Sequence, residues 1–359
     1  MKKVLMLLKS KIYAGAEKVT IEIMEKLQKE YEFYYASPNG KIAGKLRGMR
    51  YLPMRNFRIA EIRRMIRLVQ PDIIHAHDFS ASVLASLLKG VGKDRMLISH
   101  IHCNAKENLV WGKKAFFYWI ALKRIDRVIC VSDVVAKEAV FRDAWRKKAV
   151  ILENFVDRAG ILEMAERGKG TAGFGIQKKR EEVYLYDLIF VGRLSKQKNP
   201  KKFIRILDGM IREGKDIRAA LIGEGEEYEA CCQLIQRYHL EGKAEMLGFL
   251  ENPYFVMKRS RILCMTSEEE GFGLAVAEAM VLGVPVLVAE VGGMKALLGS
   301  GAEEFCRTEQ EYVKKAIRLL EDDSFYRREQ RRMKERAAGL LAVEEYMEQI
   351  RAIYKGGMV

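Results

Sequence analysis

Two glutamates bracket a glycine-rich segment at residues 270–278, which has the sequence Glu-Gly-Phe-Gly-Leu-Ala-Val-Ala-Glu. Glycines let a backbone approach a ligand closely, and the helix expected after them offers unpaired N–H groups that suit a phosphate. Glu278 would lie about one turn inside that helix, where its carboxylate can accept two hydrogen bonds from a ribose diol. Glu270 would lie beside a sugar attached to the phosphate. The alternative is an ordinary capped helix with a surface carboxylate.

A second candidate group follows another expected strand, at residues 191–200, Val-Gly-Arg-Leu-Ser-Lys-Gln-Lys-Asn-Pro. Arg193 and Lys198 would project from the carboxyl end of a sheet, where open α/β folds bind ligands. Breaking the bond between a sugar and a nucleoside diphosphate leaves negative charge on the diphosphate, and fixed cations can stabilise it in place of a metal ion. The chain contains no Asp-x-Asp motif that would hold such an ion. An isolated Arg/Lys pair of this kind is more often a solvated turn.

A third group lies at strand ends in the first half of the chain. It comprises the segment Ala-Gly-Ala-Glu at residues 14–17, the pair His75 and His77, and the pair His100 and His102. For any single histidine a core or capping role is the more common one, and we expect His75 to be structural.

Short apolar runs without polar alternation recur along the chain, each followed by a helical pattern. They occupy residues 4–8, 73–75, 96–98, 128–131, 188–191, 219–222, 262–265 and 285–289. Continuous apolar strands that alternate with helices indicate parallel sheets covered on both faces. The predicted fold class is therefore α/β, with doubly wound parallel sheets.

The chain has 359 residues, 49% of them hydrophobic, which fits two domains. The strand pattern lapses in a glycine-containing stretch that ends in Lys-Lys-Arg, and this predicts an interdomain linker. We expect an N-terminal domain at 1–165, a linker at 166–183, a C-terminal domain at 184–340 and a final helix at 341–359. That helix has apolar residues at helical spacing and must pack on another element.

The formal charge is +15, and the whole excess lies in the first half. Residues 1–170 contain 33 Lys and Arg against 18 Asp and Glu, whereas the remainder is balanced at 30 against 30. Such a half could meet nucleic acid, an anionic membrane or a phosphorylated acceptor, or be a solvated surface without a partner. Residues 113–124 combine aromatic and cationic side chains, a composition suited to the inner leaflet of a membrane, although a buried helix is an equal alternative.

The six cysteines show no Cys-x-x-Cys pair and no Cys/His ligand spacing, which argues against a zinc site and against a disulfide framework. The apolar core at residues 4–8 is too short for a signal peptide and fits a first strand. No apolar run approaches the ~18 residues of a membrane span. We therefore expect a cytoplasmic protein whose membrane contact, if any, is peripheral.

The stretch from Cys264 to Gly293 has the Glu-x7-Glu motif, a Thr-Ser-Glu-Glu segment before it and a Gly-Gly pair after the next strand. It resembles the retaining glycosyltransferases of family 4, and Arg193 and Lys198 match that family's Arg-x4-Lys pair. The resemblance covers nearly the whole chain. It implies the GT-B architecture, in which two Rossmann-like domains face a central cleft and the C-terminal helix crosses back to the first domain. The first domain would bind the acceptor and the second the nucleotide sugar.

Residue roles follow from this resemblance. Residues 14–17 match the family's Gly-Gly-x-Glu loop, with Ala14 in place of the first Gly, and His102 matches the histidine that approaches the donor sugar, with His100 as a rival. The implied catalytic residues are His102, Arg193, Lys198 and Glu270. The implied donor-binding residues are Gly15, Ala16, Gly192, Arg193, Lys198, Phe249, Glu270, Gly271, Phe272, Gly273, Leu274 and Glu278.

The resemblance implies transfer of a sugar, with retention of anomeric configuration, from a nucleotide sugar to an acceptor hydroxyl. UDP is the usual nucleotide of the family, and no metal or other cofactor is expected. The aromatic and basic first half suggests a saccharide acceptor linked to a lipid diphosphate, as in exopolysaccharide or capsule assembly. The alternatives are a sugar-nucleotide epimerase, a phosphorylase, a nucleic-acid-binding protein and a non-catalytic binding protein on the same scaffold.

Overall fold

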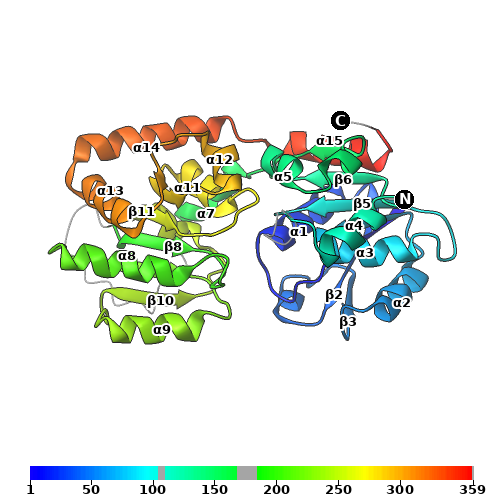
Figure 1. Cartoon of the computed structure of the whole chain (residues 1–359), viewed down its shortest axis with the longest axis horizontal. Coiled ribbons are helices and arrows are strands. Elements are labelled where there is room, and N and C mark those ends of the chain that lie inside the picture. The colour runs from blue at the N-terminus through cyan, green and yellow to red at the C-terminus, as the bar shows by residue number, and fades with distance from the viewer. Residues whose placement is uncertain (104–109, 168–183, 358–359) are drawn as a thin grey trace. The chain divides into compact units, whose positions relative to one another are not determined.

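The computed structural model describes residues 1–103, 110–167 and 184–357. The chain divides into two units, and each is described here by itself (Figure 1). Unit 1 comprises Met1–Asn154 and Val343–Val359, and unit 2 comprises Phe155–Ala342.

Unit 1 is built on a seven-stranded parallel sheet with the strand order β3-β2-β1-β4-β5-β6-β7. The strands are β1 (Lys2–Leu7), β2 (Tyr31–Pro38), β3 (Tyr51–Met54), β4 (Ile73–His77), β5 (Met96–Ile101), β6 (Arg127–Cys130) and β7 (Ala149–Ile151). The helices are α1 (Gly15–Leu27), the short 3₁₀ turn η1 (Lys41–Gly44), α2 (Ile59–Val69), α3 (Asp78–Leu88), α4 (Lys113–Ala121), α5 (Asp133–Glu138), α6 (Arg142–Trp145) and α15 (Val343–Tyr354). The strand order reverses between β1 and β4, which is where a doubly wound sheet binds ligands.

Unit 2 has a six-stranded parallel sheet with the order β10-β9-β8-β11-β12-β13. The strands are β8 (Tyr186–Val191), β9 (Ala219–Ile222), β10 (Ala244–Gly248), β11 (Ser260–Met265), β12 (Val286–Ala289) and β13 (Phe305–Cys306). The helices are α7 (Arg158–Glu166), α8 (Pro200–Arg212), α9 (Tyr228–Arg237), α10 (Tyr254–Lys258), α11 (Leu274–Leu282), α12 (Gly292–Leu298), α13 (Glu309–Glu321) and α14 (Asp323–Ala338). Here the order reverses between β8 and β11.

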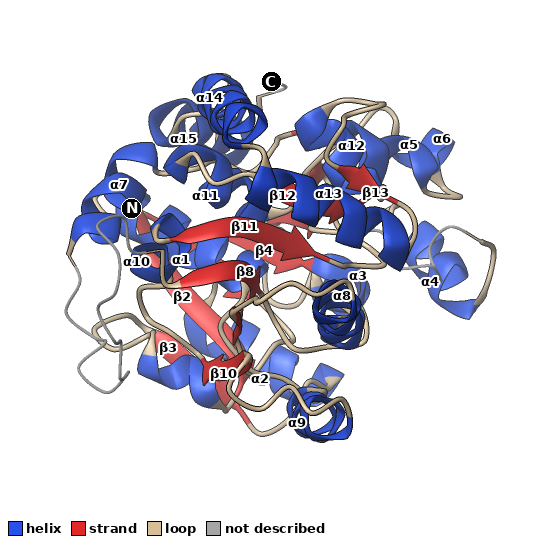
Figure 2. Ribbon diagram, turned by 90° about the vertical axis from the view of Figure 1, so that its left-hand side faces the viewer, coloured by secondary structure: helices blue, strands red, loops and turns tan. Residues whose placement is uncertain are grey.

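Both sheets are largely apolar because helices cover both of their faces (Figure 2). In β1, β8 and β11 the last four residues of each strand are fully buried and apolar. This confirms the predicted fold class of two doubly wound α/β sheets.

The division between the units lies earlier than the expected boundary at residue 165. Helix α7 belongs to unit 2 because it packs on α10 and α11, and Arg158 at its start donates a 2.9 Å hydrogen bond to the carbonyl oxygen of Ala338. The linker expected at 166–183 lies almost wholly outside the described residues.

Helix α15 is the expected C-terminal helix, and it belongs to unit 1 although it follows unit 2 in sequence. It packs on α1 through a buried stripe at helical spacing. Arg351 on its outer side forms a salt bridge of 2.9 Å with Glu30. The apolar pattern read from the sequence is therefore the face that completes the core of unit 1.

Because the Ile350 side chain is fully buried, Ile350→Ala is expected to lower the free energy of unfolding of unit 1 by about 2–5 kcal/mol. Glu348 lies on the exposed side of the same helix, and Glu348→Ala is expected to change it by no more than about 0.5 kcal/mol. Urea denaturation of the full chain measures both. Equal stabilities of the two variants would mean that α15 contributes nothing to the core.

Candidate functional site

The loop after β8 is shaped by Asn199, which has a left-handed backbone conformation with φ of +49°. Asparagine tolerates this region better than most residues. Its side-chain oxygen accepts a hydrogen bond of 3.2 Å from the Lys202 N–H, which caps α8, and Pro200 occupies the first helical turn. Lys198 is thereby held just before the start of α8.

The loop after β11 is tied to the loop after β8 by backbone and side-chain hydrogen bonds. The Thr266 hydroxyl donates to the Asn199 carbonyl oxygen at 2.8 Å, and the Glu268 N–H donates to the Gln197 carbonyl oxygen at 2.8 Å. These two loops flank the reversal point of the unit 2 sheet, so the candidate residues on them have fixed relative positions.

An ion pair between Lys198 and Glu270 joins the same two loops. The Ser267 hydroxyl also donates to the Glu270 carboxylate at 2.8 Å. The Glu270 side chain is 6% exposed and that of Lys198 is 22% exposed, so the pair is largely withdrawn from water. The structure therefore joins one predicted cation to one predicted carboxylate, a contact that the sequence motifs did not indicate.

Arg193 lies two residues beyond the end of β8 and is half-buried. Within the described parts of the chain its guanidinium makes no hydrogen bond or ion pair. Arg193 and Lys198 therefore differ: Lys198 is already neutralised by a carboxylate, and Arg193 is available to an anion.

Close backbone approach explains one glycine of the motif and backbone conformation explains another. A Cβ atom on Gly293 would lie 2.6 Å from the Glu270 carbonyl oxygen, which accepts a 2.9 Å hydrogen bond from the Gly293 N–H. Gly273, which precedes α11, has φ of +93°, a conformation that favours glycine. The glycines thus shape the loop that carries Glu270, while the Phe272 side chain is buried beneath it and only the Phe272 backbone can face a ligand.

Glu278 lies on α11 and is buried, so the alternative of a capped helix with a surface carboxylate is wrong. Its carboxylate accepts a hydrogen bond of 3.0 Å from the Tyr254 hydroxyl on α10. Sequence reasoning missed Tyr254 because a tyrosine 24 residues away carries no local motif. Of the other predicted donor-binding residues, Phe249 lies just beyond β10 with its side chain exposed.

In unit 1 the loop after β1 leads directly into α1. Ala14 caps this helix in an extended conformation that any residue adopts, so the departure from the family's Gly is sterically neutral. The Ala14 N–H donates at 3.0 Å to the Glu17 carboxylate, which is buried. Glu17 therefore fixes the start of α1, where Gly15 and Ala16 form the first turn and present backbone N–H groups.

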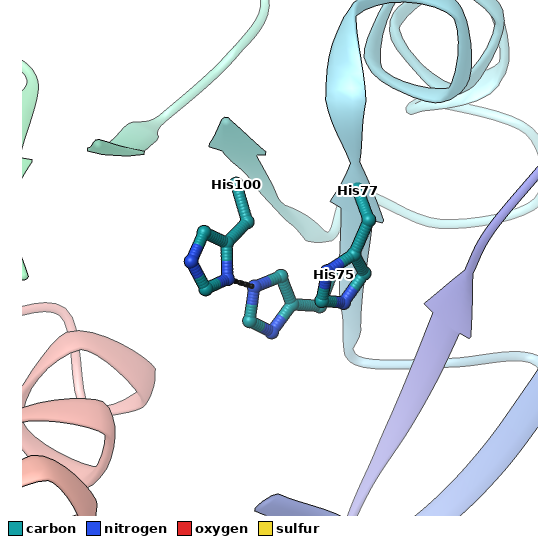
Figure 3. Close-up of side chains that lie close together, drawn as sticks. All are labelled: His75, His77 and His100. Carbon is teal, nitrogen blue, oxygen red and sulfur yellow. Dashed lines mark hydrogen bonds between the residues drawn. The ribbon is translucent and has the colours of Figure 1, made fainter. Parts of the chain in front are cut away.

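His75, His77, His100 and His102 form one group, here called the histidine cluster, and Figure 3 shows the first three of them. His77 Nδ1 and His102 Nε2 are 2.9 Å apart, and the rings of His100 and His102 stack with centroids 4.1 Å apart. Burial lowers the pKa of His102 to about 3, so its imidazole is neutral at physiological pH. His102 is partly exposed and His100 is fully buried, which favours His102 over its rival as the residue that could meet a ligand.

Two protein families match the chain in succession. The model described as Glycosyltransferase Family 4 matches residues 13–159, and the model described as Glycosyl transferases group 1 matches residues 176–339. Both models describe glycosyltransferases, and the two parallel α/β units have the GT-B fold. Its candidate residues in unit 2 lie within the group 1 match, and the histidine cluster lies within the family 4 match.

Individual relatives agree with this assignment. This GT-B chain is 28% identical over 170 residues to N-acetyl-alpha-D-glucosaminyl L-malate synthase of Bacillus anthracis, covering 46% of the chain and 44% of that protein. It is 30% identical over 199 residues to the N-acetylgalactosamine-N,N'-diacetylbacillosaminyl-diphospho-undecaprenol 4-alpha-N-acetylgalactosaminyltransferase of Campylobacter jejuni, covering 53% and 49%. The chain thus spans about half the length, or less, of the curated relatives it matches.

A solved structure shares the fold over its full length. HepE from Anabaena, crystallised with UDP and glucose, matches with a TM-score of 0.78 over 99% of this chain and 100% of that chain, at 19% identity. At this identity the likeness establishes the fold.

Tyr254→Phe is expected to lower the free energy of unfolding of unit 2 by about 1.5–3 kcal/mol, because it removes a hydrogen bond to a buried carboxylate. Tyr228 is exposed on α9 and provides the matched control, since Tyr228→Phe removes a hydroxyl from the surface. Urea denaturation monitored by far-ultraviolet circular dichroism compares the free energies of unfolding of the two variants. If Tyr254→Phe were as stable as Tyr228→Phe, other partners would have to hold Glu278.

Proposed function

We propose that this chain is a retaining, metal-independent glycosyltransferase that moves a sugar from a nucleoside diphosphate to a hydroxyl group of a saccharide. The observation that carries the proposal is the arrangement of charge at the carboxyl edge of the unit 2 sheet. A buried Lys198–Glu270 ion pair lies there beside a glycine loop, on the same sheet edge as the unpaired cation Arg193. A diphosphate needs cations and N–H donors, and this edge supplies both.

UDP is the proposed nucleotide. Glu278 is fixed by Tyr254, which leaves a carboxylate positioned for a ribose diol. The crystal structures of HepE from Anabaena contain UDP and UDP-glucose, and this fold likeness supports the choice of UDP here.

In the proposed reaction the bond between the anomeric carbon and the diphosphate oxygen breaks, and the diphosphate leaves with the electron pair. The acceptor oxygen bonds to the same carbon from the same face, and its proton passes to the departing diphosphate. Arg193 and Lys198 stabilise the charge that develops there. Glu270 fits poorly as a nucleophile because Lys198 and Ser267 already bond its carboxylate, so its proposed role is to orient sugar hydroxyls.

His102 is proposed to contact the donor sugar as a neutral hydrogen-bonding group. Its lowered pKa makes it a poor proton donor at neutral pH, which is consistent with proton transfer to the diphosphate instead. His77, 2.9 Å away, would hold its ring in place.

Arg193→Ala is expected to lower kcat by about 10²-fold or more, the scale of losing one preorganised contact to a developing charge. Lys198→Ala is expected to do the same. Arg212→Ala is the control, because Arg212 is a largely exposed arginine on α8. UDP release from a panel of UDP-sugars, with acceptor and without added Mg²⁺ or Mn²⁺, measures turnover. Full activity of Arg193→Ala or Lys198→Ala would overturn the proposed catalysis, and a strict need for Mg²⁺ or Mn²⁺ would overturn its metal independence.

The proposed acceptor is a saccharide linked to a lipid diphosphate, of the kind used in exopolysaccharide or capsule assembly, and α4 carries this part of the proposal. Its buried side is formed by Ala115, Tyr118 and Ala121. On its other side Phe116, Phe117, Trp119 and Ile120 are exposed, so α4 is not a helix of the unit 1 core that is buried on every side.

Cations flank this apolar surface. Lys113, Lys114, Lys123 and Arg124 are exposed, and the Lys123 ammonium lies 5.7 Å from the centre of the Trp119 ring. Aromatic side chains with adjacent cations are typical of surfaces that bind the headgroup region of anionic membranes. Among the described residues, no helix has the length and apolar character needed to cross a bilayer. We therefore propose peripheral binding at the inner face of the cell membrane.

The full chain is expected to co-sediment with anionic vesicles, and to be released at high salt, because about 1 kcal/mol per cation comes from the surface potential. Phe116→Ser combined with Trp119→Ser should abolish binding. The control is Leu68→Ser combined with Leu87→Ser, two exposed leucines elsewhere in unit 1. Equal binding to neutral and anionic vesicles, or no binding to either, would contradict the proposal.

A further inference from the structure

The histidine cluster contains more than the proposed transfer reaction needs. The register of β4 and β5 pairs His77 with His100, so their side chains lie on the same face of the sheet. His75 lies two residues before His77 and therefore also faces that side. Three imidazoles from two adjacent strands are thus collected at one edge of the unit 1 sheet (Figure 3).

The separations between ring nitrogens suit a metal ion. One ring nitrogen from each of His75, His77 and His100 can be chosen so that all three lie within 4.8 Å of one another. His75 Nε2 and His100 Nδ1 are 3.2 Å apart. A tetrahedral zinc ion with Zn–N bonds of 2.0–2.1 Å has ligand nitrogens about 3.3 Å apart. This pair is therefore already close to the spacing of two ligands.

Groups around two of the three imidazoles, those of His75 and His77, are placed as partners of metal ligands. Histidine ligands donate their second ring N–H to an oxygen or another acceptor, which fixes the ring orientation. His75 Nδ1 lies 2.8 Å from the Tyr354 hydroxyl on α15. The Thr20 hydroxyl lies 3.3 Å from His77 Nε2. His100 Nε2 is buried and has no hydrogen-bond partner among the described residues, so the cluster as it stands is incompletely satisfied.

The chemical state of the imidazoles also fits. All three side chains are buried, and a metal ion binds an imidazole in its neutral form. The three candidate ligands include no carboxylate. Imidazole nitrogens select zinc and its neighbours over magnesium and calcium, which prefer oxygen.

We propose that His75, His77 and His100 form a zinc-binding site in unit 1. The partly exposed His102 marks the open side of the cluster, where an ion could enter and a water could serve as the fourth ligand. The ion would join the ends of β4 and β5 to α15 through Tyr354. Because Thr20 lies beside His77 Nε2, the ion would bind His77 Nδ1 and replace the present contact of that atom with His102 Nε2.

This proposal does not depend on the transfer reaction, because the cations proposed to stabilise the diphosphate, Arg193 and Lys198, lie in unit 2. It also differs from the cysteine-based expectation of no zinc, since the proposed site uses histidine alone. The sequence signal was two His-x-His pairs at the ends of two strands, and only the pairing of those strands joins them.

Metal binding by the full chain, purified without a histidine tag and stripped with a chelator, tests the proposal in the absence of any sugar nucleotide. Metal analysis after dialysis against Zn²⁺ is expected to give about one ion per chain. Titration with Co²⁺ should give the intense visible absorption of a tetrahedral site without a band from thiolate ligands. No retained ion, or a cobalt–thiolate band, would overturn the proposal.

Variants locate the site. His100→Gln is expected to weaken Zn²⁺ affinity by more than about 100-fold, and Tyr354→Phe, which keeps all three ligands, by about 10- to 100-fold. The control is His239→Gln, which replaces the fifth histidine of the chain, exposed in unit 2. Circular dichroism checks that each variant is folded. If His100→Gln does not fold, the Tyr354→Phe affinity and the wild-type cobalt spectrum decide, and unchanged affinity in a folded Tyr354→Phe would overturn the proposed link to α15.

Discussion

The ion pair between Lys198 and Glu270 is the interaction on which the candidate site in unit 2 depends. It joins the loops after β8 and β11 where the strand order reverses, and it lies in a setting with little water. Removing one partner of such a pair is destabilising, because the remaining charge is largely withdrawn from water and has lost its counter-ion. A diphosphate can therefore attract Lys198 only if Glu270 gains other partners. In the proposed reaction sugar hydroxyls would provide them, so that binding of phosphate and of sugar would be coupled through one lysine.

Arg193 differs from Lys198 because, among the described residues, its guanidinium has no ion pair that an anion would have to break. The paired Lys198 makes the site rigid, and the unpaired Arg193 is the cation proposed to attract an anion. The glycines maintain this arrangement sterically, since a side chain on Gly293 would collide with the backbone that carries Glu270. The Tyr254 hydroxyl helps to hold the Glu278 carboxylate in place by donating a hydrogen bond to it.

The sequence predicted the two doubly wound sheets well, because apolar strands and amphipathic helices are local patterns. It also located Arg193, Lys198, Glu270 and Glu278 at strand ends or helix starts. It did not predict the contacts of Tyr254 with Glu278 or of Tyr354 with His75, since the latter pair is 279 residues apart. The boundary between the units was placed after α7 for a similar reason. Which unit a helix joins depends on its packing, and a local pattern does not contain that information.

Helix α4 shows where periodicity fails and packing decides. Its segment is apolar on almost every side, so no hydrophobic stripe distinguishes a core face from a surface face. The structure shows that Ala115, Tyr118 and Ala121 face inward, whereas Phe116, Phe117 and Trp119 are exposed. The free energy of a large apolar side chain is about 1.5–3 kcal/mol higher in water than when it is buried. The exposed side chains of α4 would therefore be stabilised by contact with an apolar surface. Unit 1 also carries nearly all of the excess positive charge, and the proposed partner, an anionic bilayer, would match both features.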